Sequence, residues 1–178
     1  MEKIKVRKNR ITSRMGGRIL ADTLVAQGID HVFAVPGESY LDVLDGLYDV
    51  RKSLKLVTCR FEAGAVNMAE AYGKLTGRPA AAFVTRGPGA CHGAIGVHIA
   101  MQDSTPMLLF VGQIPFDETD RDSFQEVDYR RMFGPLAITA GPGRPVVATS
   151  TAWAISSGMR FAWSIWVTHF ASGPNMRR

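Results

Sequence analysis

The chain has 178 residues, 46% of them hydrophobic and 21% charged, which is enough to form the core of one ordinary globular domain. Its net charge of +5 comes from the two ends, because residues 1–14 carry six basic side chains and one acid, and residues 141–178 carry four arginines and no acid. The body between them is mildly acidic, and this distribution argues against a nucleic-acid partner, which would need a basic face on the fold.

Residues 1–14 are basic, and no long apolar segment typical of a secretory signal follows them. We predict a flexible arm, because chain termini are usually loose. From residue 16 to about residue 140, apolar runs alternate with segments of helical spacing, and glycine or proline separates them. The apolar runs predict strands at 31–35, 54–59, 80–85 and 107–111, and the intervening segments predict helices at 18–27, 39–48, 62–75 and 87–101.

The predicted strands are apolar throughout rather than alternating, which is typical of a parallel sheet covered on both faces. Helices of about 10–15 residues between them indicate right-handed βαβ units. The predicted fold class is therefore α/β, with one doubly wound parallel sheet over residues 15–140 and its loops gathered at one edge.

Two segments depart from this pattern. Residues 112–133 are acidic and predict a long loop leading into a short helix, and such loops are often functional. Residues 141–178 hold all three tryptophans and no acid, and show no clear alternation of strand and helix. We expect a poorly ordered tail without a native packing partner, as truncation or a changed reading frame would produce. A membrane anchor over residues 146–170 is the alternative, but burial of the charged Arg160 inside the membrane would cost much free energy.

The two cysteines, Cys59 and Cys91, do not make a disulfide framework and fit a reducing cytoplasm, where we expect the protein. Cys59 falls in a predicted strand and is expected to be buried as a small hydrophobic residue. Cysteine and histidine show no pairs at zinc-type spacing, so the sequence predicts no metal site.

Glu62 is the most informative residue, because it follows a predicted strand directly and opens a predicted helix. It therefore belongs at the carboxyl edge of the sheet, where open α/β folds bind ligands. Residues 85–92 follow the third strand to the same edge, and their glycines allow a flat ring to approach the backbone. Residues 35–39, and residues 112–113 with 123–126, are expected there too. The alternatives are structural: Glu62 as a charge at a helix N-terminus, and the glycines as a tight turn without a ligand.

Five segments in order resemble the N-terminal, pyrimidine-binding domain of thiamine diphosphate-dependent enzymes, closest to the acetolactate synthase branch. The matching text begins with Gly-Arg-Ile-Leu and ends with Val-Pro-Gly-Glu over residues 17–38. It continues with Arg-Phe-Glu-Ala-Gly-Ala at 60–65, Thr-Arg-Gly-Pro-Gly-Ala at 85–90, Gln-Asp-Ser-Thr-Pro at 102–106 and Asp-Ser-Phe-Gln-Glu at 122–126. Each segment alone is a weak signal, but five in order make a strong one that covers about residues 15–140.

The resemblance implies that Glu62 is the catalytic glutamate, which hydrogen-bonds N1′ of the cofactor's aminopyrimidine and favours the imino tautomer that prepares the thiazolium to attack a 2-keto acid. It also implies that further residues contact the cofactor, namely Pro36, Gly37, Gly87, Pro88 and Gly89. The candidates on the substrate side are Glu38, His92 and Gln125.

Each substrate-side candidate has a structural alternative. Glu38 is either a polar contact or a helix N-terminal charge, and Gln125 either approaches the cofactor or lies in an exposed acidic loop. His92 either donates to a keto-acid carboxylate or is a surface histidine of its helix. Cys91 and His92 stand where Thr-Asn is common in this branch, which leaves the substrate open.

In this family a separate domain holds the diphosphate and its Mg²⁺ through Gly-Asp-Gly and a later Asn-Asn, and the 178 residues contain neither motif. Where FAD is used, a central domain supplies most of its contacts. The predicted function is therefore the aminopyrimidine half-site of a thiamine diphosphate-dependent carboligase or decarboxylase acting on 2-keto acids such as pyruvate, truncated and inactive alone. Its expected partner is a second copy of the chain or a diphosphate-domain chain. The alternatives are a subunit of a split enzyme and a non-catalytic interaction module that keeps the fold.

Overall fold

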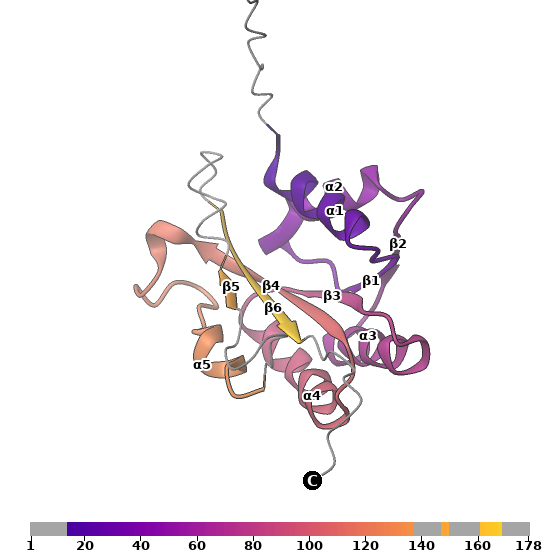
Figure 1. Cartoon of the computed structure of the whole chain (residues 1–178). Helices are drawn as coiled ribbons and strands as arrows, with labels where there is room; N and C mark the ends of the chain where they lie inside the picture. The colour runs from indigo at the N-terminus through magenta and orange to yellow at the C-terminus, as the bar shows by residue number, and fades with distance from the viewer. Residues whose placement is uncertain (1–13, 137–146, 150–160, 169–178) are drawn as a thin grey trace, which may run out of the picture.

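The computed structural model describes residues 14–136, 147–149 and 161–168. Residues 1–13 of the predicted arm lie outside the described residues, as does most of the predicted tail. Strands and helices alternate through the body of the chain (Figure 1). Its elements are α1 (Gly16–Ala26), β1 (His31–Ala34), the 3₁₀ helix η1 (Glu38–Tyr40), α2 (Leu41–Asp49), β2 (Lys55–Thr58), α3 (Glu62–Thr76), β3 (Ala80–Val84), α4 (Pro88–Asp103), β4 (Met107–Pro115), the 3₁₀ helix η2 (Phe116–Glu118) and α5 (Tyr129–Phe133).

Four parallel strands form the body of the sheet in the order β2-β1-β3-β4, which confirms the predicted doubly wound α/β fold. The chain passes from β1 outward to β2 and then returns across β1 to β3, so the strand order reverses between β1 and β3. Two strands of the predicted tail extend the sheet in antiparallel fashion: β6 (Phe161–Thr168) pairs with β4, and β5 (Val147–Thr149) pairs with β6.

Helices cover both faces of the sheet, with α1 and α2 on one side and α3, α4 and α5 on the other (Figure 1). Successive residues of a strand point to opposite faces, which divides the apolar side chains between two cores. In β3, Ala81 and Phe83 join the core under α1 and α2, whereas Ala80, Ala82 and Val84 join the core under α3 and α4. The continuous apolar run of β3 is therefore explained by burial on both faces.

The close packing of α3 against α4 fixes the two helix starts relative to each other. A Cβ on Gly96 of α4 would lie only 2.6 Å from a methyl carbon of Val66 on α3, so the helices approach at a position where only glycine fits. Helix α4 begins at Pro88, whose fixed φ suits the first helical turn. This packing sets Glu62 in the first turn of α3 near His92 in the second turn of α4.

One predicted boundary is wrong. The helix predicted at 39–48 is present within one residue at each end, with its first turn as the 3₁₀ helix η1 and the rest as α2. The strand predicted to end at residue 111 runs on to Pro115, because Gly112 is a point of close packing rather than a break: a side chain there would collide with Ser39. The loop predicted at 112–113 is therefore part of β4, and the irregular segment starts after it. The short helix predicted near residue 133 is present as α5.

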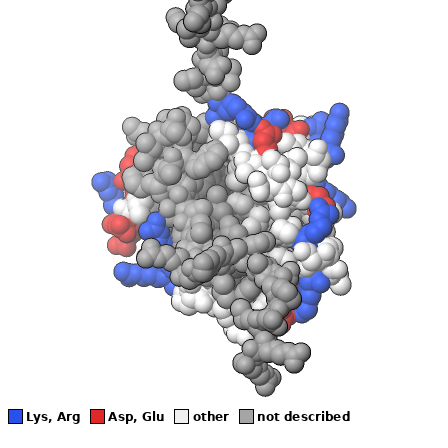
Figure 2. Space-filling model, in the orientation of Figure 1, with Lys and Arg blue, Asp and Glu red and all other residues white. Residues whose placement is uncertain are grey.

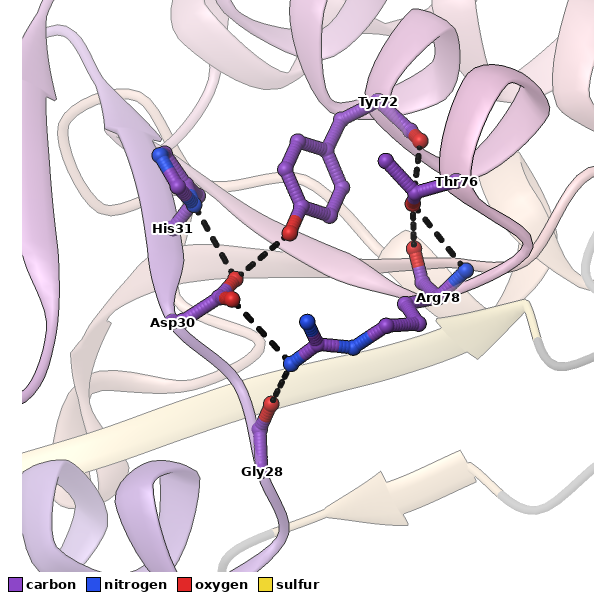
Figure 3. Close-up of polar contacts among 6 residues, drawn as sticks. All are labelled: Gly28, Asp30, His31, Tyr72, Thr76 and Arg78. Carbon is purple, nitrogen blue, oxygen red and sulfur yellow. Dashed lines mark hydrogen bonds and ion pairs between the residues drawn. The ribbon is translucent and has the colours of Figure 1, made fainter.

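A network around Asp30 joins the start of β1 to the end of α3 (Figure 3). The carboxylate of Asp30 bonds His31 Nδ1 at 3.0 Å, accepts from the Tyr72 hydroxyl at 2.8 Å and pairs with the Arg78 guanidinium at 3.1 Å. The same guanidinium nitrogen donates to the carbonyl of Gly28 at 3.1 Å. The network lies at the amino edge of the sheet, which we define as the edge where the four parallel strands begin.

Basic and acidic side chains are mixed around the face of the molecule seen in Figure 2 rather than gathered by sign. Ion pairs account for several of them: Arg18 lies 3.0 Å from Asp22 and 2.5 Å from Asp49, and Lys74 pairs with Asp103. Within the described ranges of the chain, no helix is long and apolar enough to cross a membrane.

Candidate functional site

The candidate site lies at the carboxyl edge of the sheet, which we define as the edge where the four parallel strands end. Residues 35–37 follow β1, residues 59–61 follow β2 and residues 85–87 follow β3. Because the strand order reverses between β1 and β3, the first and third of these loops flank the crevice where α/β folds bind ligands.

The loops after β1 and β3 touch directly. Ser39 Oγ lies 2.9 Å from Thr85 Oγ1, so the two hydroxyls share a hydrogen bond. A Cβ on Gly37 would lie 2.7 Å from Thr85 Cβ, closer than side chains approach in folded proteins. Glycine at position 37 is therefore required by the packing of the two loops, and this contact brings the predicted residue Gly37 into the site.

The turn after β3 is held from the opposite side by the segment that leads into α5. Gly87 has φ of +55°, a left-handed conformation that favours glycine, and its N–H donates to the Tyr129 hydroxyl at 2.6 Å. Gln125 covers the same residue, since a Cβ on Gly87 would lie 2.8 Å from Gln125 Cβ. Burial raises the pKa of Tyr129 to about 12, which leaves it a neutral hydroxyl at physiological pH.

Glu62 opens α3 just after β2, and its side chain is 13% exposed. Its Oε2 lies 3.1 Å from Nδ1 of His92, which comes from α4 and is 53% exposed. The other oxygen, Oε1, faces the start of α4, because a Cβ on Gly89 would lie 3.4 Å from it. Glu62 thus does more than supply charge to a helix N-terminus: it bridges two helices, with one oxygen toward His92 and one toward the glycine-rich turn.

The pKa of a buried tyrosine, Tyr40, is affected by the charge of this carboxylate. Tyr40 is 1% exposed, and its hydroxyl donates to the carbonyl of Val35. Its pKa is raised, first by burial and then by the negative charge of Glu62. The charge of Glu62 therefore reaches Tyr40, the residue whose hydroxyl anchors the loop after β1.

The remaining predicted residues lie around this centre. Pro36 and Glu38 are exposed in and after the loop that follows β1, and Glu38 is the first residue of η1. Pro88 is exposed and Gly89 is buried in the first turn of α4. The structure thus brings Gly37, Gly87, Gly89, Glu62, His92 and Gln125 together, with Pro36, Glu38 and Pro88 beside them on the same loops or helix ends.

Sequence reasoning placed Ser39 in a loop of this edge but missed two side chains that hold the loops in place. Tyr40 directly follows the predicted loop, so its proximity in sequence was a usable signal. Tyr129 lies 42 positions from Gly87, and nothing in the local pattern links them. Cys59 is buried as predicted, and burial raises the pKa of its thiol, while Cys91 is exposed. In the described part of the chain, no three His, Cys, Asp or Glu residues gather as a metal site would require.

Comparison with known proteins finds relatives for most of the described chain. Residues 14–132 match the family model described as "Thiamine pyrophosphate enzyme, N-terminal TPP binding domain". The chain is 38% identical over 115 residues to the mitochondrial acetolactate synthase catalytic subunit of Aspergillus candidus, covering 65% of the chain and 16% of that protein. It is 32% identical over 148 residues to the acetolactate synthase large subunit of Buchnera aphidicola subsp. Acyrthosiphon pisum, covering 80% of the chain and 26% of that protein. It is also 32% identical over 136 residues to the acetolactate synthase of Bacillus subtilis, covering 76% of the chain and 24% of that protein.

Proposed function

Because the chain belongs to the family of N-terminal, thiamine pyrophosphate-binding domains, we propose that its carboxyl edge forms the half of a thiamine diphosphate site that holds the aminopyrimidine. The observation that carries this proposal is the place of Glu62, a mostly buried carboxylate beside the point where the strand order reverses. An open α/β sheet offers its ligand crevice there, and a carboxylate is the group that suits a protonatable ring nitrogen.

The residues at the edge fit a flat aromatic ring. Gly89 has no side chain, and a Cβ there would lie 2.8 Å from Thr85 Cγ2 and 3.4 Å from Glu62 Oε1, so a larger residue would crowd Thr85 and fill the space beside the carboxylate. Gly37 and Gly87 likewise add no side chain to the loops on either side, where a Cβ would lie within 3 Å of Thr85 and of Gln125 respectively. We assign Glu62 Oε1 to the ring nitrogen, and the backbone of Gly87, Pro88 and Gly89, with that of Pro36 and Gly37, to the walls around the ring.

When bound, thiamine diphosphate supplies the electron sink on which reactions of 2-keto acids depend. Glu62 would hold a proton at the ring nitrogen, and the loops around it would limit the access of water to that proton. We propose a 2-keto acid such as pyruvate as the substrate class, because the matched relatives are acetolactate synthases. Glu38, His92 and Gln125 are the proposed groups on the substrate side.

The chain spans about a quarter or less of the length of the relatives it matches, and it carries neither Gly-Asp-Gly nor Asn-Asn. We therefore propose that the diphosphate and Mg²⁺ are held by residues outside these 178, on a partner chain or another part of an oligomer. Charge-assisted hydrogen bonds contribute about 1.5–3 kcal/mol each, so the chain by itself should bind the cofactor weakly. We also propose a reducing, cytoplasmic setting, in which Cys59 and Cys91 remain free thiols as they are in the structure.

The test measures thiamine diphosphate binding to the full chain by NMR titration, which detects millimolar affinities. We expect the Glu62→Gln variant to raise the Kd at least about tenfold, because the ring nitrogen loses its charged partner. The matched control is Glu118→Gln, an exposed acid of η2, which should leave the Kd unchanged. Equal affinities for the wild type and Glu62→Gln would contradict the proposal.

A second assay addresses the need for a partner. We expect the purified chain to form no acetolactate from pyruvate, with or without Mg²⁺. Addition of a diphosphate-binding domain from an acetolactate synthase should restore cofactor binding to the micromolar range, since the missing contacts are then supplied. Acetolactate formation by the chain alone would show that the half-site proposal is wrong.

A further inference from the structure

The contact between Glu62 and His92 is the feature of the site that the proposed function does not explain. His92 lies on the second turn of α4, and its Nδ1 is 3.1 Å from Glu62 Oε2. The ring of Phe61 lies against the imidazole with a centroid distance of 5.0 Å and an interplanar angle of 50°. The imidazole is therefore held between a carboxylate and an aromatic ring although it is largely exposed.

We propose that His92 is a positioning residue that binds Glu62 Oε2 through Nδ1 and thereby turns Glu62 Oε1 toward Gly89. The inference rests on the proposed function, in which Oε1 receives the aminopyrimidine. The two carboxylate oxygens are divided between two directions, since Oε2 meets the imidazole while Oε1 lies 3.4 Å from the Cβ position of Gly89. A carboxylate on a flexible side chain has no such preference unless a neighbour fixes one oxygen.

The geometry also limits what else His92 can do. With Nδ1 directed at Glu62, only Nε2 remains for a substrate or for water. A charged imidazole donates from Nδ1 in any case, whereas a neutral imidazole donates to the carboxylate only when its proton is on Nδ1. The arrangement therefore selects one tautomer of the neutral ring, with the proton on Nδ1, and that selection can be measured without any ligand.

The exposure of His92 allows a positioning role to be distinguished from a role in stability. The His92 side chain is 53% exposed, so loss of the imidazole should change the stability of the fold little. A residue that merely supports the fold would show the opposite pattern, with reduced stability and unchanged ligand affinity. The two roles thus differ in which measurement responds.

The first experiment reads the tautomer by long-range ¹H–¹⁵N NMR on the full chain. The chain has four histidines, and the signal that disappears in His92→Asn identifies the ring. We expect the neutral His92 ring to carry its proton on Nδ1 in the wild type and to lose that preference in Glu62→Ala. A ring protonated mainly on Nε2, or one that does not respond to Glu62→Ala, would overturn the inference.

The second experiment compares three substitutions by the same thiamine diphosphate titration. The amide nitrogen of asparagine reaches about the position of Nδ1, whereas that of glutamine reaches about the position of Nε2. We expect His92→Asn to keep the Kd within about twofold of the wild type, and His92→Gln and His92→Ala to raise it about fivefold, less than Glu62→Gln does because His92 acts only through Glu62. His98→Ala, an exposed histidine of the same helix, is the control and should change nothing.

The outcomes distinguish this inference from the function on which it rests. Wild-type binding that depends on Glu62 but not on His92 overturns the positioning role and leaves the half-site standing. Absence of thiamine diphosphate binding in the wild type removes the proposed function, and the positioning role with it. Equal affinities for His92→Asn, His92→Gln and His92→Ala, all weaker than the wild type, would show that the imidazole acts by another route and would overturn the positioning role.

Discussion

Two pairs of histidine and carboxylate lie at opposite edges of the same sheet. Asp30 and His31 precede and begin β1 at the amino edge, and their side chains bond at 3.0 Å. Glu62 follows β2 and His92 follows β3 at the carboxyl edge, and their side chains bond at 3.1 Å. By residue type and distance the two pairs are nearly the same, yet their surroundings differ.

The difference lies in how many donors each carboxylate receives. Asp30 receives Tyr72 and Arg78 as well as His31, and the hydrogen bonds from His31 and then Tyr72 lower its pKa below the ordinary value of 3.8. In the described part of the chain, the Glu62 carboxylate has a single hydrogen bond, from His92. Asp30 is thus satisfied by the fold itself, whereas Glu62 retains an oxygen that faces a glycine.

From this comparison we infer that a half-buried acid points to a binding site when the protein leaves one of its oxygens without a donor. Among the described residues, Glu62 Oε1 has no hydrogen-bond donor from the protein, and the side chain is 13% exposed, so this oxygen is available to a donor from solvent or from a ligand. A place beside a strand does not make the distinction, because Asp30 directly precedes β1 and Glu62 follows β2. Substitutions at both edges can test whether structural side chains differ from functional ones in how many of their hydrogen bonds the protein itself supplies, rather than in the edge where they lie.

The largest expected change in stability comes from Tyr129, a hydroxyl at the carboxyl edge that is hydrogen-bonded within the protein. Tyr129→Phe removes the hydroxyl that accepts from the buried N–H of Gly87, and a buried donor left without a partner costs about 2 kcal/mol. We expect the free energy of unfolding, measured in urea at pH 7, to fall by that amount. Tyr48→Phe, at an exposed tyrosine of α2, is the control and should change it by less than about 0.5 kcal/mol. Equal stability of the two variants would show that the Tyr129 contact is not a support.

The next effect concerns the amino edge. Asp30→Asn removes the charge that three donors share, and because the Asp30 side chain is 35% exposed we expect a loss of only about 1 kcal/mol. The matched control is Asp45→Asn, an exposed acid of α2, with an expected change below about 0.5 kcal/mol. If both variants unfold at the same urea concentration, the network of Figure 3 does not stabilise the fold.

Acid should remove the same stabilisation gradually. The pKa of Asp30 is lower in the folded state than its ordinary value of 3.8, so its contribution is present above that value and is lost as the pH falls through the folded pKa. The stability difference between the wild type and Asp30→Asn should therefore shrink below about pH 4. Urea unfolding at several pH values between about 2.5 and 6 measures it, and a difference that stays constant would mean that ionisation of Asp30 is not the cause.

The sequence predicted the sheet well because each strand is fixed by a property of its own residues. The run from Ala80 to Val84 is apolar because both faces are buried, and the observed strand matches the prediction within one residue. The end of β4 was wrong because Gly112 looks like a break in the sequence. Its absent side chain serves instead the contact with Ser39, 73 positions away, and only the folded chain shows that.

The site was predicted in part for the same reason. Loops at the ends of parallel strands meet at one edge whatever their side chains, so Glu62 and Gly89 could be placed together from the pattern alone. The partner of Glu62 could not, because His92 lies 30 positions away and reaches it only through the packing of α3 on α4. Local pattern thus predicts which residues share an edge, and tertiary packing decides which of them are satisfied.

The smallest expected effect is the change in stability on replacing Glu62, and it is the most direct test of the comparison. Glu62→Gln loses one bond to an exposed histidine and part of a favourable charge at the start of α3, but it also removes the cost of a mostly buried charge, so we expect a net change below about 0.5 kcal/mol. Glu70→Gln, on the same helix, is the matched comparison, since that buried carboxylate accepts from Thr105 at 3.0 Å and should lose more. A small change at Glu62 together with a larger one at Glu70 means that the fold does not depend on the carboxylate at the open edge, which is then free to serve a ligand. A loss at Glu62 as large as that of Asp30→Asn would mean that both carboxylates are structural, and the distinction between the two edges would fail.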